Sequence, residues 1–258
     1  MGMGKMDFSL QRANAWKRIS ALLLDGILLS ILAVGIGTLM SLLFDYESHS
    51  ARLEETFARY ENEYGISFSI SQEEYEDFSP EEKEKYDTAY AALTEDSDAV
   101  QLYQKIVNLM LLMVTFSLLA AFLILEFAVP LWLGHGRTIG KKIFGLALTT
   151  QEGVRIRTMA LFVRTVLGKF TIETMIPAYV MTMLFFNMVG LFGTLLLLIL
   201  AVCQLIMYFT SENRMVLHDR MAGTVVVDFA SQMIFETHED MLEAKKRAAA
   251  ERAKHREW

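Results

Sequence analysis

The chain has 258 residues and a formal net charge of −7, with 53% of its residues apolar and 21% charged. The apolar fraction exceeds that of a typical globular domain, so the apolar and the charged residues must be separated along the chain. This composition excludes a uniformly polar, disordered protein, and we expect no nucleic-acid partner.

Three segments are apolar over about the 20 residues that a helix needs to cross a bilayer. They are 19–44, 106–133 and 189–209. A fourth segment, 161–186, contains charged residues but is long enough for one more crossing. The first segment is longer than the apolar region of a signal peptide, and no small-residue cleavage site follows it. The sequence therefore predicts four transmembrane helices.

Basic residues predict the orientation, because Lys and Arg concentrate in cytoplasmic segments. Residues 1–18 carry four Lys and Arg and residues 134–169 carry seven, whereas residues 45–105 carry seventeen Asp and Glu against five Lys and Arg. We therefore expect both termini in the cytoplasm. In chain order we expect a cytoplasmic N-terminus (1–18), a first crossing (19–44), an acidic extracytoplasmic insertion (45–105), a second crossing (106–133), a cytoplasmic amphipathic and hairpin segment (134–160), a third crossing (161–186), a fourth crossing (189–209) and a cytoplasmic C-terminal segment with a charged helix (210–258).

The acidic insertion contains signals typical of helices. Ser71-Gln-Glu-Glu and Ser79-Pro-Glu-Glu are helix starts, and Asp96 can cap a helix that continues into the second crossing. We expect a small cap of two or three helices. Two interpretations of its role stay open: it collects cations or recognises a partner, or it is a solvated insertion that shields the outer ends of the helices.

The segment after the second crossing is rich in glycine and lysine. These glycines and lysines are Gly136, Gly140, Gly145, Lys141 and Lys142. The full GxxxxGK[ST] pattern is absent, so we do not expect nucleotide binding. We interpret the segment as a surface-lying amphipathic helix followed by a β-hairpin, with LALTT and VRIRT as its strands. The basic residues of this segment are then expected to bind anionic lipid head groups, each with about 1 kcal/mol: Lys141, Lys142, Arg155 and Arg157.

The segment ENRMVLHDRMAGTVVVD follows the fourth crossing, at residues 212–228. Its His218-Asp219 pair has no second histidine at metal-ligand spacing and no nucleophile motif nearby. We therefore expect no enzymatic activity, no metal and no cofactor, and we expect Asp219 to pair with an arginine at the membrane edge.

Together these motifs resemble the RDD family of bacterial membrane proteins. The resemblance rests on Arg18 and Asp25 in the first crossing, on GRTIGKKIFGL after the second and on HDRMAGT after the fourth. The family takes its name from one Arg and two Asp, which fall here on Arg18, Asp25 and Asp219. The further motif residues are Gly136, Thr138, Gly140, Lys141, Gly145, His218, Gly223 and Thr224.

The motifs span residues 12–46 and 106–228, whereas the acidic insertion and the tail after residue 236 depart from the family pattern. The resemblance implies an all-α membrane domain in the bacterial cytoplasmic membrane. It also implies transport, with cation–proton exchange as the activity most often proposed for the family.

Several ionisable residues fall at membrane depth: Asp25, Glu126, Arg164, Glu173 and, near the edge, Arg18 and Asp219. Asp25 and Glu126 lie at matching depths and are expected to face each other, with Arg18 and Arg164 as countercharges. Such a cluster is either a site that exchanges a proton or a cation, or a set of pairs that only holds helices in register. A cavity that reaches Asp25 favours the first interpretation, and a dry Arg–Asp pair without a cavity favours the second.

The sequence thus predicts a multi-pass protein that transports small cations, protons or another small solute. The alternative is a non-catalytic membrane partner or scaffold, which binds other proteins through the acidic insertion and the charged helix at 236–258. In both cases we expect anionic lipids at the cytoplasmic face, and a protein partner or a second copy of the chain stays open.

Overall fold

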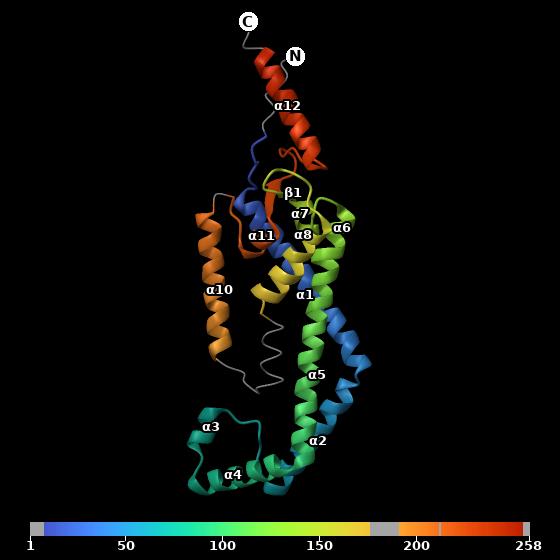
Figure 1. Cartoon of the computed structure of the whole chain (residues 1–258). Coiled ribbons are helices and arrows are strands. Elements are labelled where there is room, and N and C mark those ends of the chain that lie inside the picture. Colours follow the sequence, from blue (N-terminus) through green and yellow to red (C-terminus); the bar gives the residue numbers. More distant parts are fainter. Residues whose placement is uncertain (1–7, 176–190, 212, 255–258) are drawn as a thin grey trace. The chain divides into compact units, whose positions relative to one another are not determined.

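The computed structural model describes residues 8–175, 191–211 and 213–254 and is mostly helical, as predicted (Figure 1). The chain forms two compact units. The first, Met1–Val34 with Leu118–Trp258, carries the glycine-, aspartate- and arginine-containing motifs. The second, Gly35–Ser117, carries the acidic segment.

Among the described residues, two continuous helices are long and apolar enough to cross a membrane. One is α1 (Ala15–Leu43), which has 29 residues. The other has 37 residues, Ser97–Leu133, and consists of α5 (Ser97–Phe122), the π-helical η1 (Leu123–Ala128) and α6 (Val129–Leu133). Their positions agree with those of the first and second predicted crossings.

The other two predicted crossings are described in part. The apolar helix α10 (Leu191–Thr210) covers most of the fourth. The third begins with α8 (Thr158–Phe162) and the π-helical η2 (Val163–Glu173), and its remainder from residue 176 lies outside the described residues.

Pro130 explains why η1 departs from α-helical geometry. Proline has no N–H, so it cannot donate to the carbonyl four residues earlier, which belongs to Glu126. The Val129 N–H instead bonds to Ile124 O, five residues back. The freed Glu126 carbonyl accepts a hydrogen bond of 2.9 Å from Thr165 Oγ1, which joins η1 to η2.

The strands pair differently from the predicted hairpin. β1 (Leu146–Thr150) pairs antiparallel with β2 (Thr224–Asp228), and Leu148 lies opposite Val226. The turn before Val154 does form, but the VRIRT segment contributes only isolated bridges, from Arg155 to Thr149 and from Val154 to Phe235. The predicted turn and one bridge of the hairpin therefore form, but VRIRT is not a strand, and the strand partner of LALTT is β2. The reason lies in the side chains: β2 offers a run of β-branched residues that is buried on both faces, whereas VRIRT alternates with exposed arginines.

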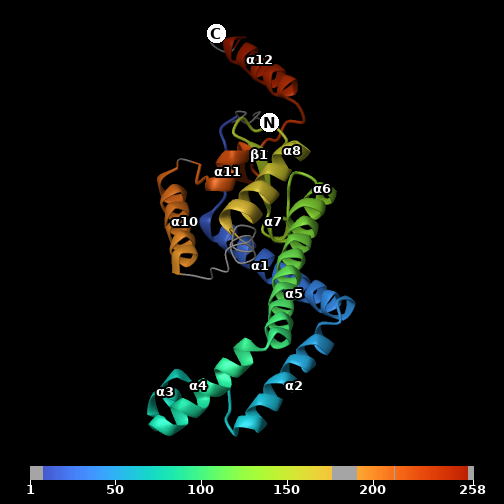
Figure 2. The ribbon, with the colours of Figure 1, turned by 60° about the horizontal axis from the view of Figure 1, so that its bottom comes forward.

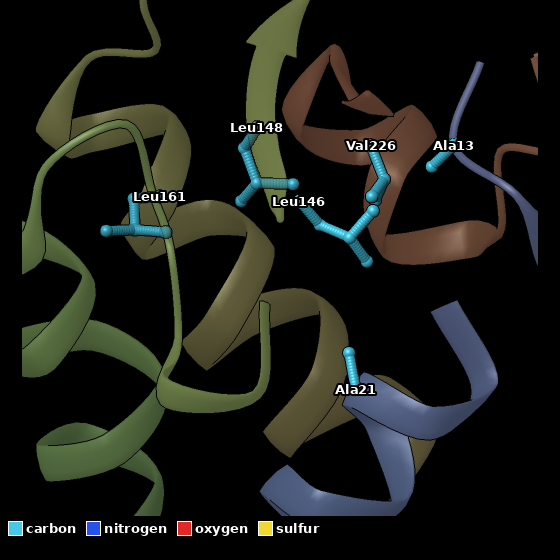
Figure 3. Packing of buried hydrophobic residues seen from close by; sticks show 6 residues of the cluster. All are labelled: Ala13, Ala21, Leu146, Leu148, Leu161 and Val226. Atoms are coloured by element: carbon cyan, nitrogen blue, oxygen red, sulfur yellow. The ribbon is translucent and has the colours of Figure 1, made fainter. Parts of the chain in front are cut away.

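Apolar clusters cover both faces of this two-stranded sheet. A pair of strands is unstable in water alone, so this packing is what stabilises it. On one face, Figure 3 shows side chains from β1, β2, α8, α1 and the preceding segment converging: Ala13, Ala21, Leu146, Leu148, Leu161 and Val226. The other face is covered by a second cluster: Ala147, Met215, Val225 and Val227, with Leu10 and Ile234 against it.

The acidic segment folds into three helices, α2 (Tyr46–Tyr64), α3 (Gln72–Asp77) and α4 (Pro80–Glu95). Both predicted helix starts are confirmed, because Ser71 and Ser79 each form a capping box. Asp96 Oδ1 accepts from the N–H groups of Asp98 and Ala99 at the start of α5, as predicted. Figure 2 shows α3 beside α4, and their aromatic contact joins Tyr75 to Tyr86 with ring centroids 5.3 Å apart. That this segment lies outside the cytoplasm stays a prediction.

The predicted charged C-terminal helix is α12 (His238–Lys254). Glu243 and Arg247 form the expected pair one turn apart, with Oε2 and the guanidinium nitrogen 3.1 Å from each other. Met241 and Ala248 are buried, while most other described side chains of α12 are exposed.

A charged cavity as candidate functional site

The first unit contains a cavity of about 490 Å³. Its walls come from α1, η1, η2, α10 and two short helices, α7 (Ile139–Ile143) and α11 (Leu217–Ala222). Its lining includes an unusual number of ionisable side chains: Arg18, Asp25, Glu126, Lys141, Arg164, Lys169, Glu173 and His218. The predicted Asp25 and Glu126 therefore line one cavity, and so do four cations.

Asp25 is held by the beginning of α7 rather than by an arginine. Its Oδ2 accepts a hydrogen bond of 2.5 Å from Thr138 Oγ1, and its Oδ1 accepts one of 2.8 Å from Gly140 N. Thr138 is also the N-cap of α7 and accepts from the Lys141 N–H. The α7 N-terminus thus solvates a carboxylate on α1, as free N–H groups at helix starts commonly do.

Gly140 is required for this contact because of the close approach of α1. A Cβ atom at this position would lie 2.4 Å from Ala21 O and 2.9 Å from Asp25 Cγ. Gly136 is constrained in a different way: its φ is +60°, and a Cβ would lie 2.5 Å from Ile156 Cδ1. The glycines of this motif therefore have a structural explanation, including Gly145 with its φ of +67°.

Lys141 is not on the exposed surface where we expected it to meet lipid head groups, and lipid binding stays a prediction. Its side chain is buried with 8% exposure, and its Nζ lies 3.2 Å from Thr138 Oγ1 and 3.9 Å from Asp25 Oδ2. Burial lowers the pKa of Lys141 to about 8, although Glu126 and Asp25 counteract that shift. The two lysines could not be distinguished from the sequence, but of the pair Lys141 is buried and Lys142 is exposed.

Asp219 on α11 has no solvent exposure. The two arginines that we expected near Asp25 lie beside Asp219 instead. Arg164 NH1 pairs with Asp219 Oδ1 and donates to Thr224 Oγ1 at 2.8 Å. Arg18 NH2 lies 3.7 Å from Asp219 Oδ2, and its NH1 donates to Arg214 O at 3.0 Å. The prediction that Asp219 pairs with an arginine at the membrane edge agrees with this geometry, while Arg18 and Arg164 are not the partners of Asp25.

Thr224 and Gly223 complete the surroundings of Asp219. Thr224 Oγ1 lies 3.2 Å from Asp219 Oδ1, and Gly223 ends α11 with a φ of +63°. The HDRMAGT motif therefore positions a carboxylate, a hydroxyl and the turn into β2.

Glu126 pairs with Lys169, a residue that sequence reasoning missed. Lys169 Nζ lies 2.5 Å from Glu126 Oε2, and both side chains are almost buried. Lys169 follows Arg164 by five residues, which places the two on different sides of an α-helix. Because η2 has π-type hydrogen bonds between residues five apart, both side chains reach the cavity. An α-helical reading of the sequence could not indicate this.

His218 and Glu173 form the remaining polar pair of the cavity. His218 Nδ1 lies 2.7 Å from Glu173 Oε1, and the His218 backbone N–H donates to the same oxygen at 3.1 Å. Gly168 permits this approach, because a Cβ there would lie 2.6 Å from His218 Cβ. Burial and the surrounding cations hold the pKa of His218 well below its usual value.

Within the described ranges, no group of three or more His, Cys, Asp or Glu side chains is arranged to hold a metal ion. Asp25, Asp219, Glu126 and Glu173 are separately engaged with cationic or neutral donors. What the arrangement can do chemically is bind or release a proton at Lys141 and offer hydrogen-bond donors to a molecule in the cavity.

The apolar helices and this buried polar cavity define a helical membrane protein with an ionisable interior site. The family comparison agrees with the motifs. The chain belongs to the RDD family, whose family model matches residues 12–223. No curated protein and no solved structure matches the chain.

Proposed function

We propose that this RDD-family membrane protein transports a small solute and that the cavity beside Asp25 is its binding site. The observation that carries the proposal is that the family motifs build the cavity: Asp25 from α1 and Lys141 from α7 both line it. Ionisable residues in a membrane protein are energetically costly and commonly mark the path of a substrate or proton. The cavity volume of about 490 Å³ is in the range of small-molecule sites.

The proposal includes a multi-pass arrangement in the bacterial cytoplasmic membrane, with four crossings and both termini inside. Two complete apolar helices and α10 support three of these crossings. Protease added to intact cells tests the orientation, because it should cut in the acidic segment and spare α12. Cleavage of α12 in intact cells would contradict the proposed topology.

A second candidate function is that of a membrane partner or scaffold. The enclosed Asp219–Arg164 pair favours it, because such a pair can hold helices together without any transported substrate. The acidic segment offers a surface for a partner, since α2 has no buried residue. In this case the charged residues of the cavity only build the fold.

Flux in proteoliposomes tests the transport proposal. Purified wild-type protein is compared with Asp25→Asn and with Asp77→Asn, a control at an exposed acid of α3. Proton flux is driven by Na⁺ or K⁺ gradients, and uptake of labelled phosphate is measured in the same vesicles. We expect flux above that of empty liposomes that Asp25→Asn abolishes and Asp77→Asn retains. Folded protein without flux in any of these assays would contradict transport of these ions and favour the partner function.

A further inference from the structure

The polar groups of the cavity that can still form further hydrogen bonds are mainly donors. Both Asp25 oxygens already accept hydrogen bonds, and Glu126 Oε2 is paired with Lys169. The cations are less fully used. Within the described part of the chain, the Arg18 guanidinium makes one hydrogen bond, to Arg214 O, and it carries five N–H donors.

Tyr208 on α10 adds an unused hydroxyl to this set. It lines the cavity, and its hydroxyl oxygen is buried without a hydrogen-bond partner among the described residues. Buried polar atoms almost always have a partner, so an unpartnered hydroxyl at a cavity is a candidate hydrogen-bond donor to a ligand. The Arg18 guanidinium carbon lies 5.1 Å from the centre of the Tyr208 ring, so the two groups are neighbours.

The electrostatics of this end of the cavity favour a negative group. Four cations line the cavity, Arg18, Lys141, Arg164 and Lys169, against three carboxylates, Asp25, Glu126 and Glu173. Asp219 does not line the cavity within the described residues, and its close partner is Arg164, whereas Arg18 NH2 lies 3.7 Å from Asp219 Oδ2. The three lining carboxylates are each already engaged by a nearby donor, Lys141, Lys169 or His218, so a metal cation would have to compete with these groups.

We propose that the cavity binds a small anion, whose carboxylate or phosphate group accepts hydrogen bonds from Arg18 and Tyr208. An attached apolar part of the ligand packs against the apolar wall, to which Leu22, Leu29 and Phe122 contribute. This inference rests on the proposed function, because it names the substrate class of the same cavity. The anionic group belongs either to a free organic or inorganic anion or to the head group of an anionic lipid.

Binding to the purified full chain in a non-ionic detergent tests this proposal by calorimetry. The probes are butyrate, inorganic phosphate and mixed micelles that contain phosphatidylglycerol, with phosphatidylcholine micelles as the uncharged comparison. The test variant is Tyr208→Phe, which removes only the unpartnered hydroxyl and should leave the ligand-free protein at least as stable as the wild type. The control is Tyr90→Phe, at an exposed tyrosine of α4.

We expect at least one anionic probe to bind, with an affinity about tenfold lower in Tyr208→Phe and unchanged in Tyr90→Phe. Binding of butyrate or phosphate without lipid identifies a free anion as the ligand, and binding of phosphatidylglycerol alone identifies a lipid head group. The proposal is overturned if no anionic probe binds, or if Tyr208→Phe binds as tightly as the wild type. Cation-driven flux without anion binding would overturn this inference and leave the transport proposal standing. Anion binding without flux would support this inference and contradict the transport proposal.

Discussion

Asp25 and Asp219 are the same side chain in two different environments. Asp219 has no exposure and is neutralised by Arg164, whose positive charge does not titrate at physiological pH. Asp25 lines a cavity, is solvated by a hydroxyl and a backbone N–H, and has only the more distant ammonium of Lys141 as a countercharge. The difference separates a carboxylate that holds the fold together from one whose surroundings can respond to a ligand or a proton.

The largest effect should come from removing the fixed countercharge of Asp219. Arg164→Met leaves that carboxylate buried without its main partner, so we expect the free energy of unfolding to fall by about 3–5 kcal/mol. Unfolding by SDS in detergent micelles measures the change. The control is Arg155→Gln, which breaks the exposed pair with Glu236 and should cost at most about 1 kcal/mol. Equal effects of the two substitutions would show that the Asp219 environment is not structural.

The Lys141 side chain should make stability depend on pH in the Asp25 environment. Its pKa falls to about 8 in the folded protein from an ordinary value of 10.5, so the unfolded state binds more protons between these two values. The contribution of Lys141 to the free energy of unfolding therefore rises as the pH increases from about 8 to 10.5, by about 3 kcal/mol in total. The other charged groups that act on Lys141 are Asp25 from α1, Glu126 from η1, and Arg164 and Lys169 from η2.

The difference between wild type and Lys141→Met isolates this dependence, because the remaining titrating groups are common to both proteins. Lys142→Met is the matched control, since Lys142 is the exposed neighbour and should leave the pH profile unchanged. A wild-type profile that stays parallel to that of Lys141→Met from pH 7 to 10.5 would contradict a titrating Lys141.

The close approach of α7 to Asp25 can be tested by adding one methyl group. Gly140→Ala places a Cβ within 2.4 Å of Ala21 O, so α7 must move away from α1 and the Gly140 N–H loses Asp25. We expect a loss of about 1–3 kcal/mol in the free energy of unfolding. Gly26→Ala is the control on α1, where a Cβ meets nothing within 4 Å and should be neutral or slightly stabilising. A neutral Gly140→Ala would mean that the contact is not tight.

The sequence predicted two long apolar helices, the two capped helix starts and part of the set of buried charges, because hydropathy and capping are local properties. It did not predict which charges pair. Asp25 and Arg18 are close in sequence and lie on the same side of α1, yet their partners come from α7 and α11, and only the packing of those short helices decides the pairing.

Two further features were beyond sequence reasoning for identifiable reasons. Lys169 entered the site because η2 has π-helical geometry, which changes the side of the helix that a residue faces. β1 pairs with β2, more than seventy residues away, because the valine run of β2 is buried on both faces of the sheet. The nearer VRIRT segment follows a turn, but exposed arginines alternate with its apolar residues.

The last test makes a small chemical change beside each aspartate, because it replaces a threonine hydroxyl by a methyl group. Thr138→Val removes the 2.5 Å bond to Asp25 and also the N-cap of α7, so we expect a loss of about 2–3 kcal/mol. Thr224→Val removes the 3.2 Å contact with Asp219 and the 2.8 Å hydrogen bond from Arg164, but Arg164 still neutralises that carboxylate, so the loss should be about 1–2 kcal/mol. SDS unfolding of both variants measures the difference. If Thr224→Val proved the more damaging, the neutral donors would matter more at Asp219 than at Asp25, and the contrast between a fixed and a responsive carboxylate would fail.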